Sequence, residues 1–165
     1  MRDRDTERRP WGLPHIAQDR RVMIQLEITQ EIKAPIEKVF AYVTDLRRAT
    51  EWQAGVSESS QTPDGPTQIG TRFRTVRTIF GQRIEATGEV TEFVANEKCA
   101  FRSTSGPMQF SLRQTFEPEG EGTRVHLHVE IEGSGLFKVA EGALKNNLAR
   151  EFEKQARRLR EILEG

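Results

Sequence analysis

The chain has 165 residues, of which 35% are hydrophobic and 30% charged, and this composition fits one ordinary globular domain. Lys and Arg number 25 and so do Asp and Glu, so no net charge would draw the chain to nucleic acid. A single cysteine excludes an internal disulfide and a cysteine zinc site. No apolar run reaches the roughly 18 residues of a membrane helix, and no signal peptide is evident. We expect a cytoplasmic protein that neither binds nucleic acid nor inserts into a membrane.

The first 22 residues mix charges of both signs with proline and glycine, and they follow neither a helical nor a strand period. We interpret residues 1–22 as a flexible tail. A patterned region begins at Met23, so we expect residues 23–165 to form the folded domain.

The patterned region opens with a strand and two short helices. Alternating apolar residues predict a strand over residues 23–32 with one face in water. Pro35 suits the first turn of a helix, and apolar residues then recur at helical spacing up to Val43. Asp45 can cap a second short helix over residues 46–52, because its side chain can accept the free amides of the next turn.

Six further strand patterns follow, separated by turn residues. They cover residues 55–61, 71–80, 83–94, 99–104, 108–116 and 123–131. The connections are of hairpin length, which makes neighbouring strands antiparallel. Together with the first strand they predict a curved antiparallel sheet of about seven strands.

The chain closes with an amphipathic helix predicted over residues 136–164. Its apolar residues recur at intervals of three or four and are Leu144, Leu148, Phe152, Ala156, Leu159 and Leu163. At 1.5 Å per residue the helix is roughly 40 Å long, enough to cross the concave face of the sheet. Gly142 lies inside this pattern at a cost of about 1 kcal/mol against alanine, which suggests a kink or a close contact.

This order of elements resembles the helix-grip fold of the SRPBCC superfamily, which includes START lipid-transfer domains, the birch pollen allergen and polyketide cyclase/dehydratase families. The resemblance rests on IEKVFAYVTDLRRATEW at 36–52, GTRFRT at 70–75, GEVTEFVANEKCAFRS at 88–103 and the closing helix, and it covers residues 23–164. It implies an α+β fold in which a seven-stranded curved sheet wraps around a long C-terminal helix. It also implies a cavity between sheet and helix for a small apolar or amphipathic molecule.

Such a cavity would be lined by the concave face of the sheet, the short helices and the inner face of the long helix. Our candidate ligand-binding residues are Trp52, Phe73, Arg77, Ile84, Phe101, Met108, Phe110, Leu112, Gln114, Phe137 and Val139, with Leu127 deeper. Each apolar member could instead be ordinary core, since buried aromatic residues usually serve packing.

Arg77 is the sharpest of these candidates. If Phe73 points inward, the period of two along strand 71–80 turns Arg77 inward as well. A guanidinium inside an apolar cup needs a carboxylate, carbonyl groups or an anionic ligand, so Arg77 would hold a carboxylate or enolate oxygen. Alternatively, a bulge near Thr75 returns Arg77 to solvent, or Arg77 pairs with Glu85 across the hairpin.

The remaining polar candidates are few. Gln114 shares a face with apolar neighbours and would orient a ligand oxygen. His126 and His128 leave one face of a strand, a spacing that could hold a metal ion, but they share that face with Glu130 and are expected at the surface. Cys99 lies in an apolar context and is expected to be an inert buried thiol.

Two main functions are consistent with these patterns. The first is a module that carries, sequesters or senses a small hydrophobic or amphipathic metabolite or lipid. The second is an enzyme resembling polyketide cyclases or dehydratases, in which Arg77 would stabilise an enolate and Gln114 would position the substrate, with no catalytic acid or base assigned. A third is a protein-interaction module with an apolar patch beside the long helix. We expect a small hydrophobic ligand, no cofactor, no metal, and a monomer or homodimer.

Overall fold

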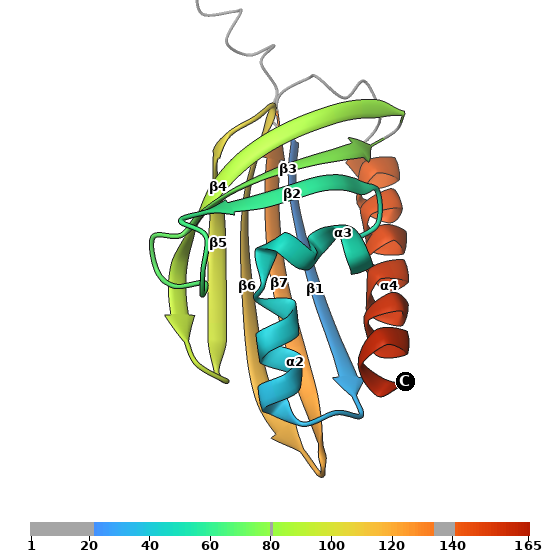
Figure 1. Cartoon of the computed structure of the whole chain (residues 1–165). Coiled ribbons are helices and arrows are strands. Elements are labelled where there is room, and N and C mark those ends of the chain that lie inside the picture. Colours follow the sequence, from blue (N-terminus) through green and yellow to red (C-terminus); the bar gives the residue numbers. More distant parts are fainter. Residues whose placement is uncertain (1–21, 80, 134–140) are drawn as a thin grey trace, which may run out of the picture.

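A computed structural model describes residues 22–79, 81–133 and 141–165 (Figure 1). The strands are β1 Val22–Ile32, β2 Val56–Thr62, β3 Arg72–Ile79, β4 Gln82–Val94, β5 Lys98–Ser105, β6 Met108–Glu119 and β7 Gly122–Gly133. The helical segments are α2 Ile36–Val43, the 3₁₀ turn η2 Leu46–Arg48, α3 Ala49–Trp52 and α4 Glu141–Glu164. The predicted α+β helix-grip architecture is therefore confirmed, whereas the predicted helical residues 136–140, including Phe137 and Val139, lie outside the described residues.

The strands form one antiparallel sheet in the order β1-β7-β6-β5-β4-β3-β2. β1 pairs with β7 over its whole length, from Val22 opposite Gly133 to Ile32 opposite Thr123, so the first and last strands of the chain are neighbours. The helices between β1 and β2 connect the two edges of the sheet, and α4 lies along β1 (Figure 1). No helix in the described part of the chain is long and apolar enough to cross a membrane.

The short helices begin where the sequence predicts. Pro35 is the N-cap of α2, a place that its fixed φ allows and that needs no backbone N–H. An Oδ1 atom of Asp45 accepts a hydrogen bond of 3.2 Å from the backbone N–H of Arg47, which confirms the predicted cap. The chain therefore turns twice over a short distance, and these turns place α3 at the side of the sheet where β2 begins.

One end of the fold is filled by aromatic rings. Phe40 of α2 meets Phe93 of β4 and Phe116 of β6 edge-on, with ring centroids 5.2 and 5.0 Å away. Lys38 donates a hydrogen bond of 3.1 Å to the carbonyl oxygen of Leu163, and this bond satisfies one of the last carbonyls of α4. We call this region the closed end, because these contacts join α2, α4 and the sheet.

A second apolar cluster joins the first part of α4 to β1 and β7. Its buried members are Ile24, Leu26, Val129, Ile131, Leu144 and Leu148. Leu144 and Leu148, two residues of the predicted amphipathic pattern, thus face the core. α4 therefore packs against the rest of the fold toward both ends of its described length, through Leu144 and Leu148 in this cluster and through Leu159 and Leu163 at the closed end.

Replacing Gly88 or Gly142 by alanine is expected to have opposite effects on the stability of the fold. Gly88 lies opposite Phe73 in the sheet, and a Cβ there would lie 2.6 Å from the carbonyl oxygen of Arg102. Gly88→Ala is expected to lower the free energy of unfolding by about 1–3 kcal/mol.

A Cβ at Gly142 meets nothing within 4 Å among the described residues, so the close contact expected there is absent. Gly142→Ala should raise stability by up to about 1 kcal/mol, and urea unfolding of both variants checks the signs.

Candidate functional site

A cavity of about 260 Å³ lies between the concave face of the sheet and α4. Its walls include most of the candidate residues, namely Trp52, Arg77, Ile84, Phe101, Met108, Phe110, Leu112, Gln114 and Leu127. These side chains come from α3 and from strands β3 to β7, and α4 covers them from the other side. The structure thus brings together residues that lie far apart in the sequence. That they bind a ligand stays a prediction.

The cavity has an open side and a closed side. The lining residues Thr78 and Pro107 are exposed, and Asn147 and Glu151 of α4 are partly exposed, so these four mark the mouth. At the other side the lining consists of buried residues next to the closed end, such as Leu159. A ligand would therefore enter between the β3–β4 hairpin, the turn before β6 and α4.

Phe73 is a candidate that does not line the cavity. Its ring is 7% exposed and packs edge-on against Phe101, with centroids 5.6 Å apart, over the space that Gly88 leaves open. Phe73 is therefore core behind the wall, whereas Phe101 forms the wall itself. Two other candidates, Phe137 and Val139, lie outside the residues that the structure describes.

Arg77 points into the cavity. β3 pairs with β4 without a register shift, and Arg77 lies opposite Ile84, another lining residue. The register shift of this region is on β2, between Val56 and Glu58, rather than near Thr75. The bulge that would return Arg77 to solvent is therefore not present on β3, and that alternative is wrong.

The second alternative, an ion pair between Arg77 and Glu85, is also wrong. Glu85 pairs instead with Arg74 at 2.8 Å on the outer face of the sheet. Arg77 Nη2 donates a hydrogen bond of 3.0 Å to Gln53 Oε1. Burial lowers the pKa of the Arg77 guanidinium from its ordinary value, and no acidic side chain among the described residues offsets this effect. An arginine stays protonated at neutral pH, so the cavity contains a cation that has no ion-pair partner among the described residues.

Two further polar atoms of the lining have no hydrogen-bond partner in the described part of the chain. They are Trp52 Nε1 and Gln114 Oε1. Their residues are only 9% and 6% exposed. Leaving a buried donor or acceptor unpaired costs about 1–3 kcal/mol, and such atoms in native proteins normally meet water or a ligand. The cavity can therefore hold an apolar body, an anionic oxygen and uncharged oxygen atoms.

Sequence reasoning missed several lining residues. Gln53, which accepts the Arg77 hydrogen bond, follows α3 in a segment without a period, so no pattern marks it. Phe152 of α4 has the helical spacing of a core residue, yet it lines the cavity. Thr75 and Gln155 are buried polar members of the same wall. Periodicity shows which residues face inward, but it does not show which of them face empty space.

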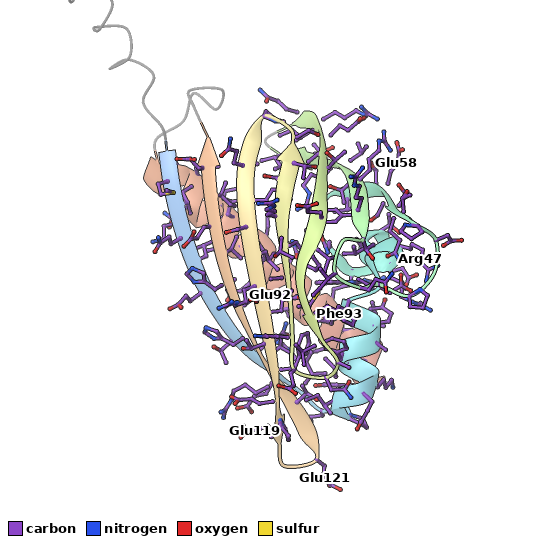
Figure 2. The ribbon with its side chains drawn as sticks, turned by 90° about the vertical axis from the view of Figure 1, so that its left-hand side faces the viewer. Arg47, Glu58, Glu92, Phe93, Glu119 and Glu121 are labelled. Atoms are coloured by element: carbon purple, nitrogen blue, oxygen red, sulfur yellow. The ribbon has the colours of Figure 1, made fainter. Side chains whose placement is uncertain are left out.

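The outer face of the sheet carries charged side chains, and Figure 2 shows this side with Glu58 and Glu92 labelled and α4 behind the strands. His126 Nδ1 lies 2.7 Å from the hydroxyl of Thr29, and His128 lies between Glu27 and Glu130 at 3.4 and 3.2 Å. Both histidines thus lie on the outer face, as predicted. Among the described residues no group of three or more possible ligands could hold a metal ion.

Cys99 is fully buried beside the closed end, on β5. Burial raises the pKa of its thiol to about 12, so the thiol stays protonated at neutral pH. This agrees with the expected inert role, because a thiolate is the reactive form.

The comparisons with known proteins match this architecture. The family model described as "Polyketide cyclase / dehydrase and lipid transport" matches residues 23–164. The chain belongs to this family. No curated protein matches the chain at a significant level. The matched range runs from β1 to the last residue of α4, so it includes every strand and helix of the described fold.

Solved structures share the fold of this family member. A START superfamily protein from Mycobacterium smegmatis is 19% identical with a TM-score of 0.71, and the match covers 85% of this chain and 97% of that one. A Thermus thermophilus protein is 23% identical with a TM-score of 0.66, covering 82% and 97%. The Zhui aromatase/cyclase from a Streptomyces species is 16% identical with a TM-score of 0.70, covering 86% and 94%. At these identities the likeness shows the fold alone.

Proposed function

We propose that the protein binds a small, mainly apolar ligand that carries an anionic oxygen, and that Arg77 holds this oxygen. The observation that supports the proposal most is the Arg77 guanidinium, which lines an apolar cavity and has Gln53 as its hydrogen-bond partner. A cation removed from water needs a countercharge, and a ligand carboxylate or enolate would supply it. Binding would serve to carry, sequester or sense the ligand.

The volume and the lining of the cavity further limit which ligands fit. Its volume of about 260 Å³ is slightly below the roughly 300–1,000 Å³ typical of pockets for drug-sized ligands. Aromatic and aliphatic walls, such as Phe101, Leu112 and Phe152, would stabilise an apolar body by about 25 cal/mol per Å² of buried surface. A compact ring compound or a short acyl chain fits these limits.

A direct test compares probes that share one ring system and differ in charge. We expect 2-naphthoate to bind about 10-fold or more tightly than protonated 2-naphthylmethylamine, because a hydrogen bond to a charged group contributes about 1.5–3 kcal/mol. Trp52 lines the cavity, so its fluorescence should report binding in a Trp11→Phe background, which removes the other tryptophan. Equal affinity for the two probes, or binding of neither, would contradict the proposal.

A cyclase-like reaction in the same cavity is the second candidate. The observation in its favour is the same guanidinium, which could stabilise the developing enolate oxygen of a carbonyl substrate. Mass spectrometry separates the two functions, because a pure binding module returns its ligand unchanged. A change in the mass or retention of a polycarbonyl probe after incubation would favour the enzyme.

A further inference from the structure

Besides Arg77, a second buried polar side chain lines the cavity. Gln114 lies on β6 opposite Cys99 of β5 and Leu127 of β7, in the middle of the sheet. Its side chain lines the cavity and is 6% exposed, and its Oε1 atom has no partner in the described part of the chain. A buried carboxamide without a hydrogen bond is rare in native proteins, so this group requires an explanation.

Gln114 and Arg77 lie toward opposite sides of the cavity. Phe116, which follows Gln114 by two residues on β6, belongs to the closed end. Arg77 is next to Thr78, which marks the mouth, and near the β3–β4 hairpin. Between these sides lie apolar walls such as Leu112 and Phe101. A ligand that spans the cavity from Arg77 inward would therefore bring its far end toward Gln114.

Trp52 adds a second unpaired polar atom. Its ring is 9% exposed at the end of α3, and its Nε1 atom can only donate a hydrogen bond. The Gln114 carboxamide can accept through Oε1 or donate through Nε2. A ligand hydroxyl can donate to Gln114 Oε1 or accept from Trp52 Nε1, a carbonyl oxygen can only accept, and a methyl or methylene group can do neither. A fatty acyl chain with its carboxylate at Arg77 would leave both atoms unpaired.

We propose that Gln114 and Trp52 form a second binding subsite for an uncharged oxygen of the ligand, so that the cavity selects compounds with oxygen functions at both ends. This inference rests on the proposed function, because it assumes a ligand held by Arg77. The ligand class is then a compact oxygenated ring compound with an anionic oxygen near the mouth and a hydroxyl group near the closed end, because a hydroxyl can donate to Gln114 Oε1. Plain hydrocarbons and saturated acyl chains are poorer ligands.

The test uses matched ligands that differ by one hydroxyl group at the far end of the ring. Wild-type protein is expected to bind 6-hydroxy-2-naphthoate about 10-fold or more tightly than 2-naphthoate, by isothermal titration calorimetry. Gln114→Leu should abolish or reverse this preference, and Trp52→Phe should reduce it while keeping an aromatic ring. Gln109→Leu on the exposed side of the same strand is the control, and it should leave the preference unchanged.

The outcomes separate this inference from the proposed function. Equal affinities of wild-type protein for the two naphthoates, unchanged in Gln114→Leu, would overturn the second subsite while Arg77 could still be essential for both ligands. Failure of both naphthoates to bind would overturn both proposals for this ligand class. Gln114→Leu removes an unpaired buried group, so its melting temperature should equal or exceed that of the wild type, and this measurement shows that the variant is folded.

Discussion

Replacing Arg77 by methionine is expected to weaken the binding of 2-naphthoate by about 10- to 100-fold while leaving the fold intact or more stable. The guanidinium is the only cation among the described lining residues, so its loss removes the countercharge for a ligand carboxylate. Methionine keeps the apolar stem and removes a charge whose burial opposes folding. Calorimetric titration measures the affinity, and thermal unfolding measures the stability.

Arg74 provides the matched control for this variant. It lies on the same strand, but it forms ion pairs with Glu58 at 3.2 Å and Glu85 at 2.8 Å on the outer face. Arg74→Met should leave ligand affinity unchanged and should alter stability by at most about 1 kcal/mol, as is usual for exposed ion pairs. The assignment would be wrong if Arg77→Met bound naphthoate like the wild type, or if both variants lost affinity equally.

The strands could be predicted because they follow from local alternation, whereas the same alternation left the inward direction of Arg77 open beside a bulge near Thr75 and a pair with Glu85. A residue's face in a strand depends only on its register, and the unbroken β3–β4 pairing keeps Arg77 on the inner face. Its partner Gln53 could not be predicted, because the contact depends on how α3 docks against the end of β3. Contacts of this kind depend on tertiary placement, which no local pattern records.

The cavity itself depends on details that periodicity does not contain. Phe73 and Phe101 both face inward, and from the sequence both are equally good wall residues. Gly88 distinguishes them, because the missing side chain lets the Phe73 ring settle against the sheet as core. Phe152 shows the converse, since its helical spacing indicates core, yet it is half-buried and lines the cavity while it packs against the cluster of β1, β7 and α4. The size of the cavity depends on the distance between α4 and the sheet, and the pattern of apolar residues in the sequence does not determine that distance.

Truncating the closed end should produce the largest loss of stability. Phe40 is 5% exposed and meets two aromatic rings edge-on, so Phe40→Ala removes apolar burial and leaves an enclosed void. The expected loss is about 3–5 kcal/mol, a large part of the roughly 5–15 kcal/mol typical of a whole domain. Urea unfolding at equilibrium measures this loss, and Phe40→Leu, with a loss of about 1–2 kcal/mol, gives a variant that stays folded.

Phe152→Ala is the informative comparison, because the two phenylalanines differ in what surrounds them. Phe152 is half-buried and faces space that already exists, so its truncation widens an open cavity instead of creating a closed void. Its expected loss is below about 2 kcal/mol, and the wider cavity should accept a larger anionic ring compound than the wild type does. Equal losses for Phe40→Ala and Phe152→Ala would mean that the space beneath α4 is packed as densely as the closed end. A ligand would then have no room beside Arg77, whatever the charge of that side chain.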